Sequence, residues 1–140
     1  MATTEFCLPL RVYIEDTDAG GIVYYVNYLK YIERARTEFM RALGMHRGAV
    51  FNDELMFVVS NLSVDYRRPA KLDDELVATA TLESVAGASL KLRQAVRKGD
   101  ELLMQAQVSL ACVNPQALLP RRIPKDMLAK LRANIDSTGS

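Results

Sequence analysis

The feature that most restricts the fold of this chain is the alternation of apolar and polar residues through its second half. Residues 56–70, 74–87 and 89–114 alternate with a period of two, as strands with one buried face do. The last of these segments contains the turn sequence Lys98-Gly99-Asp100, which predicts a hairpin with two alternating arms. The pattern therefore predicts four long strands in succession, mostly antiparallel.

A long helix precedes these strands. The apolar positions of residues 26–43 are three and four residues apart, which is the helical period. They are Tyr28, Ile32, Ala35, Phe39 and Leu43. Charged residues such as Arg36 fall mostly on the other faces, and Gly44 marks the expected end of the helix.

A first strand over residues 6–13 and a short basic helix over residues 120–134 complete the expected elements. Their order predicts an α+β fold in which one long helix lies on one face of an antiparallel sheet. The chain of 140 residues suits a single domain, over residues 1–135, followed by a disordered tail at residues 136–140.

Composition and charge narrow the class of protein. A formal net charge of +1 gives no strong field, which argues against a nucleic-acid binder. No apolar run approaches the ~20 residues of a membrane span, and the N-terminus lacks the basic and apolar regions of a signal peptide. Cys7 and Cys112 stand far apart, which disfavours a disulfide scaffold and a zinc site. We expect a cytoplasmic protein with no metal, no cofactor and no stable membrane insertion.

Residues 15–28, EDTDAGGIVYYVNY, join the first strand to the helix. They contain the groups that could take part in a chemical reaction. Gly20 and Gly21 let the backbone approach a ligand closely. A helix that begins near Val26 has free N–H groups in its first turn, and these polarise a carbonyl oxygen placed there. The Asp18 carboxylate, a few residues upstream, can attack that carbonyl or activate a water to do so. These parts suit acyl transfer to water.

The same stretch also has a purely structural interpretation. Aspartate and glycine before a helix are ordinary turn and capping residues, and Asp16 fits that role well. The single histidine, His46, follows the expected helix end and is interpreted as an exposed loop residue, so acid–base chemistry falls to a carboxylate. Tyr28 lies on the apolar stripe and is predicted to be core, whereas a structural and a binding role for Asn27 carry equal weight.

The stretch DTDAGGIVYYVNY, followed by a helix that carries ERAR, resembles the motif of the hotdog-fold acyl-CoA thioesterases. Within them the chain is most similar to the 4-hydroxybenzoyl-CoA thioesterase and YbgC-like family, which YRRPAKLDDEL at residues 66–76 also matches. The resemblance covers about residues 10–115. It implies a hotdog fold, in which a curved antiparallel sheet wraps around a long central helix. It also implies a homodimer or homotetramer with active sites between subunits.

The resemblance implies an acyl-CoA substrate and roles at two positions. Asp18 matches the catalytic carboxylate, as nucleophile or general base, and Tyr25 matches the position whose backbone N–H polarises the thioester carbonyl. YbgC-like members usually have His where this chain has Tyr25, and often Tyr where it has Ile14. The 4-hydroxybenzoyl-CoA thioesterase branch has a tyrosine at the position of Tyr25. The resemblance therefore favours a mechanism in which Asp18 acts together with the backbone N–H of residue 25.

The remaining candidate residues are expected to bind the substrate. Coenzyme A carries phosphates, so basic side chains should line its route. The candidates are Gly21, Tyr24 and Asn27 around the loop, and Arg67, Arg68, Lys71, Lys91 and Arg93 for the phosphates. For any one of these basic residues, a solvated charged surface is the competing interpretation.

Three other functions compete with a thioesterase. A non-catalytic module that binds an acyl thioester or an acyl carrier protein would keep the pocket and the basic residues, and it would tolerate Asp18→Asn. Dehydratases and hydratases of the same fold use a histidine with the acid, which this motif lacks. A plain assembly subunit would use DTDAGG only as a turn. The sequence leaves the acyl group open, and the donor is either coenzyme A or an acyl carrier protein.

Overall fold

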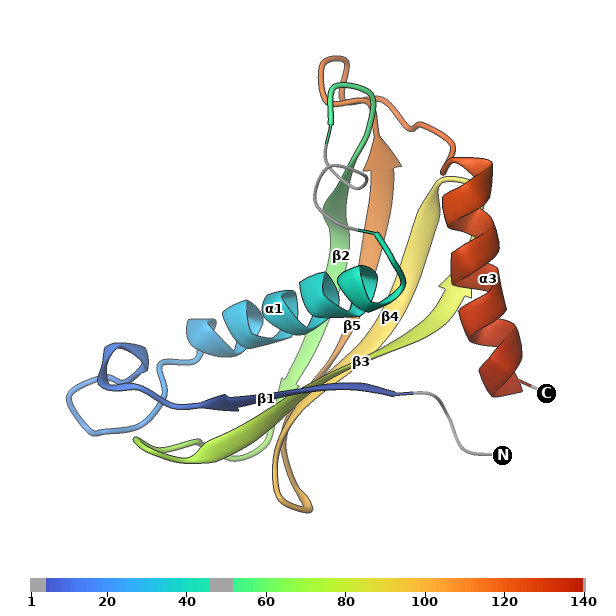
Figure 1. Ribbon diagram of the computed structural model, residues 1–140. Helices are drawn as coiled ribbons and strands as arrows, with labels where there is room; N and C mark the ends of the chain where they lie inside the picture. The colour runs from blue at the N-terminus through green and yellow to red at the C-terminus, as the bar shows by residue number, and fades with distance from the viewer. Residues whose placement is uncertain (1–4, 46–51, 140) are drawn as a thin grey trace.

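The computed structural model describes residues 5–45 and 52–139 (Figure 1). Within these residues one strand is followed by a long helix, four strands and a second helix. The elements are β1 (Phe6–Arg11), the short 3-10 turn η1 (Ile14–Asp16), α1 (Val26–Ala42), β2 (Met56–Tyr66), β3 (Glu75–Val85), β4 (Ser89–Lys98), β5 (Glu101–Val113) and α3 (Lys125–Gly139).

The strands form an antiparallel sheet in the order β1-β3-β4-β5-β2. The hairpin predicted at Lys98-Gly99-Asp100 joins β4 to β5, and Gly99 takes a φ of 59°, which glycine adopts without steric cost. β1 and β2 are the edges, which agrees with the position of Pro9 in β1. Figure 1 shows α1 running across one face of this sheet, so the predicted α+β architecture is confirmed.

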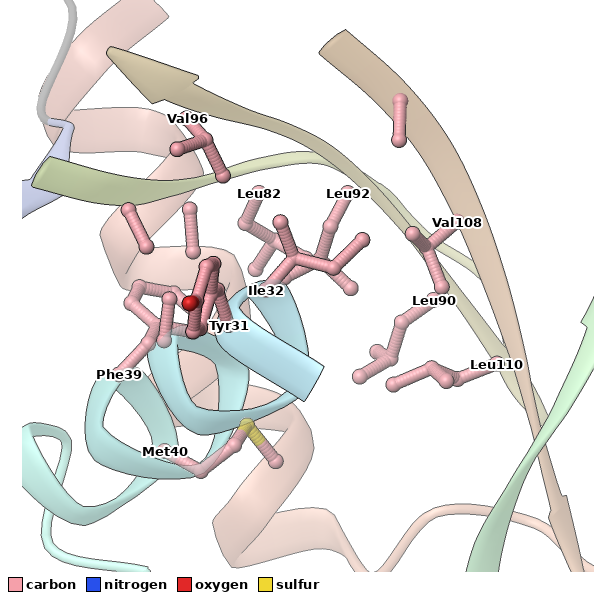
Figure 2. Packing of buried hydrophobic residues seen from close by; sticks show 14 of the residues in the cluster. Tyr31, Ile32, Phe39, Met40, Leu82, Leu90, Leu92, Val96, Val108 and Leu110 are labelled. Carbon is pink, nitrogen blue, oxygen red and sulfur yellow. The ribbon is translucent and has the colours of Figure 1, made fainter. Parts of the chain in front are cut away.

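The apolar stripe of α1 forms the centre of the core. Ile32 and Phe39 are buried with Tyr31, and they belong to one cluster with Leu92 and Val96 of β4 (Figure 2). Burying each large side chain of this kind contributes roughly 1.5–3 kcal/mol, so the stripe holds the helix firmly on the sheet. The start of α1 is therefore attached to a rigid element.

One charged residue of α1 departs from the prediction that its charges lie on the other faces. Arg36 is half-buried, and its Nη1 donates to Oε1 of Gln94, 3.0 Å away. Burial lowers the pKa of Arg36 from its usual value. Gln94 is fully buried and its Nε2 donates to the carbonyl oxygens of Ile32 at 2.8 Å and Thr79 at 3.1 Å. This amide therefore ties the middle of α1 to β3 and β4.

The first helix was predicted to within one residue, whereas the second lies five residues further along the chain than predicted. α1 ends at Ala42, and Gly44 follows with a φ of 85°, as expected of a helix stop. The second helix begins at Lys125 rather than residue 120, since Pro120 and Pro124 precede it in extended chain. Helical backbone continues to Gly139, through most of the segment for which the sequence predicted a disordered tail. In the part of the chain that the structure describes, no helix is long and apolar enough to cross a bilayer.

The strand predicted over residues 56–70 is shorter than expected, and this matters for the site. β2 ends at Tyr66, because the N–H groups of Arg67 and Arg68 both donate to the carbonyl of Leu103, at 2.8 and 3.0 Å. The chain turns away from β5 at that point. Residues 67–72 are thereby free to pack against the loop before α1.

Candidate active site

Asp18 lies at the tip of a tight turn. Its Oδ1 accepts the N–H of Gly20 at 2.9 Å, and its carbonyl accepts the N–H of Gly21 at 3.1 Å. Gly21 has a φ of 74°, which a side chain at this position would strain. The N–H of Asp18 donates to the carbonyl of Ile22 at 3.0 Å, which closes the turn. The carboxylate is held by its own loop but remains exposed to solvent.

The start of α1 has no side-chain cap. Tyr25 is the N-cap residue, and no side-chain oxygen accepts from the first turn. Among residues 5–45 and 52–139, no hydrogen bond is found from the backbone N–H of Tyr25 or Val26. These donors are the first groups of the helix, where its dipole favours negative charge. The structure therefore provides the unpaired backbone donors that the sequence predicted next to the Asp18 loop.

Asp16 joins the loop to the start of α1 through hydrogen bonds. Its carbonyl accepts the N–H of Tyr24 at 3.0 Å and the Nδ2 of Asn27 at 2.8 Å. Its Oδ2 accepts the N–H of Tyr13 at 2.9 Å. The side chain of Asn27 is nearly buried and donates to the loop, which gives it a structural contact, while its binding role stays a prediction.

The two segments that carry the family resemblance meet in space. Val23 donates its N–H to the carbonyl of Ala70 at 2.9 Å, and Leu72 donates to the carbonyl of Gly21 at 3.0 Å. The N–H of Ala70 donates to the hydroxyl of Tyr28 at 2.7 Å. Loop 15–25 is therefore clamped between α1 and the connection that follows β2.

A cluster of tyrosines lies over the start of α1. The ring of Tyr25 packs against Tyr24 at 5.1 Å and against Tyr66 at 5.9 Å between centroids, and Tyr66 packs against Tyr28 at 5.7 Å. Tyr28 is buried, as predicted, and burial raises its pKa. Tyr24, Tyr25 and Tyr66 remain 49%, 56% and 42% exposed, so their rings offer an aromatic surface beside Asp18's loop.

The sequence prediction missed Tyr66 as part of the site. The signal that could have found it is the alternation in β2, which places Tyr66 on the same sheet face as Val64, toward α1. Its distance along the chain from Tyr25 hides the contact until the fold brings them together.

Tyr31 is a buried hydroxyl below this cluster. Its side chain is 1% exposed, and its oxygen has no partner that meets hydrogen-bond geometry among the residues the structure describes. Burial raises the pKa of Tyr31, and the nearby Asp16 carboxylate adds to the effect. Tyr31 therefore stays protonated across the working range of most proteins.

Replacing Tyr31 with Phe is expected to change the free energy of unfolding by less than about 1 kcal/mol at pH 7, because no partner of the lost hydroxyl meets hydrogen-bond geometry and the nearby Asp16 carboxylate already accepts the Tyr13 N–H. Below the ordinary pKa of 10.0, folded and unfolded Tyr31 are both protonated. Above it the unfolded chain loses the proton first, so stability falls as pH rises. Between pH 10 and 11, the free energy of unfolding of the wild type should fall by about 1 kcal/mol more than that of the variant. Urea unfolding measures this, and a loss of 2 kcal/mol in the variant at pH 7 would show instead that the hydroxyl is paired.

Three of the five basic candidates lie near the loop. Arg67 and Arg68 directly follow Tyr66, and each is exposed and paired with an acid, Asp65 at 2.9 Å and Glu101 at 3.3 Å. Lys71 is exposed, and its backbone forms an isolated β-bridge with Ile22, next to Gly21. All three residues lie on the connection after β2 that packs against the Asp18 loop.

Lys91 and Arg93 lie elsewhere. Leu90 and Leu92 of β4 face the core under α1, so the alternating Lys91 and Arg93 face the opposite side of the sheet. Arg93 pairs with Glu83 at 3.3 Å and lines a shallow polar hollow there. The structure does not bring these two residues together with Asp18. His46, the single histidine, lies outside the described residues.

Comparison with known proteins assigns a family. The model of the Thioesterase superfamily matches residues 20–105, more than half of the chain. The chain belongs to the thioesterase superfamily. It is 41% identical over 133 residues to the acyl-CoA thioester hydrolase YbgC of Escherichia coli, covering 94% of this chain and 99% of that protein. It is 40% identical over 130 residues to the acyl-CoA thioesterase YbgC of Haemophilus influenzae, covering 92% and 96%.

Solved structures agree with this assignment. A probable thioesterase from Bartonella henselae superposes with a TM-score of 0.81 at 32% identity, covering 86% of this chain and 100% of that one. The predicted family, the hotdog fold and a thioester-hydrolysing enzyme are thereby confirmed.

Proposed function

We propose that this chain hydrolyses acyl-CoA thioesters to the free acid and coenzyme A, with Asp18 as its catalytic carboxylate. The observation that carries the proposal is the placement of an exposed carboxylate on a turn that leads into an uncapped helix start with unpaired N–H groups. The names of the E. coli and H. influenzae relatives support the substrate class.

In the proposed reaction the thioester carbonyl oxygen accepts a hydrogen bond from the Tyr25 N–H. The helix dipole adds to this polarisation and stabilises the oxyanion that forms. Asp18 then acts in one of two ways. As nucleophile, its oxygen bonds to the acyl carbon, the carbon–sulfur bond breaks, and water hydrolyses the resulting anhydride. As general base, it takes a proton from the water that attacks the same carbon; the carbon–sulfur bond then breaks and the proton passes to the departing thiolate. Either route releases one acid and one thiol.

The side chains around the loop are proposed to hold the rest of the substrate. The exposed rings of Tyr24, Tyr25 and Tyr66 can pack against an aryl or an aliphatic acyl group. Arg67, Arg68 and Lys71 are the proposed contacts of the coenzyme A phosphates, because they lie on the connection that touches the loop. Lys91 and Arg93 could join them only if the substrate, or a second subunit, reaches around the sheet edge.

A homodimer or homotetramer is part of the proposal. β2 is an edge strand, and its Val59 and Leu62 are 49% and 41% exposed on the side that faces the helix layer. Such an edge favours pairing with a second chain. An acyl carrier protein remains the alternative donor to coenzyme A.

Replacing Arg68 with Ala is expected to raise KM for acyl-CoA about three- to tenfold with kcat within about twofold, because a phosphate contact is made equally in ground and transition states. Arg41→Ala is the matched control, since Arg41 is also exposed and paired with an acid, Glu38 at 3.0 Å. Initial-rate kinetics measure both. An unchanged KM in Arg68→Ala would remove this residue from the coenzyme A route.

The proposed function is tested by thiol release from a panel of short, long and aromatic acyl-CoAs. Turnover on any member supports the proposal, and the profile names the acyl class. No turnover on the whole panel, with coenzyme A still bound in calorimetry, would favour the non-catalytic binding module. The replacement of the histidine usual in YbgC-like proteins by Tyr25 is the feature that keeps this second candidate in view.

A further inference from the structure

The peptide group that carries the Tyr25 N–H is held through its own oxygen, since the Tyr24 carbonyl accepts the N–H of Asn27 at 2.8 Å, and the peptide groups on both sides of it are held as well. On the upstream side, the N–H of Tyr24 donates to the carbonyl of Asp16 at 3.0 Å. On the downstream side, the hydroxyl of Tyr66 donates to the carbonyl of Tyr25 at 3.3 Å. The N-cap position has no side-chain cap of its own, and these contacts hold its backbone while the N–H groups of Tyr25 and Val26 stay unpaired among the described residues.

The downstream contact bears directly on the direction of the N–H. Only two torsions separate the N–H from the carbonyl of one residue, and Tyr25 holds them at φ −57° and ψ −29°. With its carbonyl held, Tyr25 has little freedom to turn its N–H. An oxyanion donor must keep a fixed direction, because its effect depends on alignment with charge that develops during the reaction.

Tyr66 is itself anchored to the sheet. It is the last residue of β2 and pairs with Met104 of β5. The next two N–H groups, of Arg67 and Arg68, both donate to the carbonyl of Leu103. The ring packs edge-on against Tyr25 and at a tilt against the buried Tyr28. Tyr66 thus links the edge strand to the N-cap residue of α1.

We propose that Tyr66 is a positioning residue, which acts through Tyr25 by holding its backbone so that its N–H points at the thioester carbonyl. This proposal rests on the proposed thioesterase function. The hydroxyl of Tyr66 is occupied by the Tyr25 carbonyl, so it acts on the reaction through that backbone.

Tyr66→Phe tests the proposal, because it removes the hydroxyl and keeps the ring contacts. We expect kcat for acyl-CoA hydrolysis to fall about three- to tenfold, with KM within about twofold and an unchanged melting temperature. A merely structural hydroxyl would lower the melting temperature and leave kcat alone. Tyr13→Phe is the control, since it removes one phenol oxygen from a ring that is 60% exposed.

A second measurement does not depend on turnover. Amide hydrogen exchange at Asn27 and Tyr28, whose N–H groups donate to the carbonyls of Tyr24 and Tyr25 at 2.8 and 3.3 Å, should be faster in Tyr66→Phe than in wild type and unchanged in Tyr13→Phe when followed by NMR. Unaltered kcat or unaltered exchange in Tyr66→Phe overturns the proposal. Absence of hydrolysis by wild type would instead count against the proposed function, and the exchange experiment would then decide the role of Tyr66 alone.

Discussion

Asp18→Asn is expected to lower kcat/KM for acyl-CoA hydrolysis by about a hundredfold or more and to leave the fold intact. The amide keeps the oxygen that accepts the Gly20 N–H, so the turn at the tip of the loop is preserved. What the variant loses is the negative charge that attacks the acyl carbon or takes a proton from water. The unpaired Tyr25 and Val26 N–H groups are retained, which leaves binding and carbonyl polarisation largely unchanged.

Thiol release measured over a range of acyl-CoA concentrations gives kcat and KM separately for this variant. Asp126→Asn is a suitable control, since it removes one exposed carboxylate from α3, which lies far from the loop between β1 and α1 (Figure 1). Circular dichroism melting checks that both variants are folded. Full activity in a folded Asp18→Asn enzyme would show that another group performs the chemistry. A hundredfold loss with unchanged KM would place Asp18 in the transition state rather than in substrate binding.

The order and type of the elements could be predicted from the sequence because they depend on local periodicity. The helical spacing from Tyr28 to Phe39 and the alternation after residue 56 each determine an element without reference to the rest of the chain. The ends were less accurate where a tertiary contact decides them. β2 stops at Tyr66, short of Pro69, because the carbonyl of Leu103 takes the next two N–H groups.

The candidate site was only partly predictable for the same reason. Asp18, Gly21 and Tyr25 share one short loop, so their grouping follows from the sequence itself. The contact of Tyr66 with Tyr25 joins residues 41 apart in the chain, and no local pattern contains it. Lys91 and Arg93 lie on the sheet face away from α1, so within one subunit they stand apart from the Asp18 loop, and their contact with the phosphates stays a prediction.

Gln94 is the second position at which a large effect is expected, here on stability. It pairs in the sheet with Ala80 and Ala106, two small buried residues that leave room for its side chain beneath α1. Its amide forms hydrogen bonds with the guanidinium of Arg36 and with the carbonyls of Ile32 and Thr79 at the same time. A half-buried guanidinium without a partner is costly, so the network should matter more than one hydrogen bond.

Replacing Gln94 with Met keeps the side-chain volume and removes all three contacts, and it is expected to lower the free energy of unfolding by about 2–4 kcal/mol. Gln105→Met on β5 faces the other side of the sheet and should change it by less than about 1 kcal/mol. Urea unfolding with an unchanged slope separates stability from compactness. Adding Arg36→Met to Gln94→Met should recover part of the loss, because the uncompensated charge is then absent. A double variant no more stable than Gln94→Met alone would assign the lost stability to the hydrogen bonds with the carbonyls of Ile32 and Thr79. The glutamine would then be buried because it joins the helix to the sheet, rather than because it compensates a buried charge.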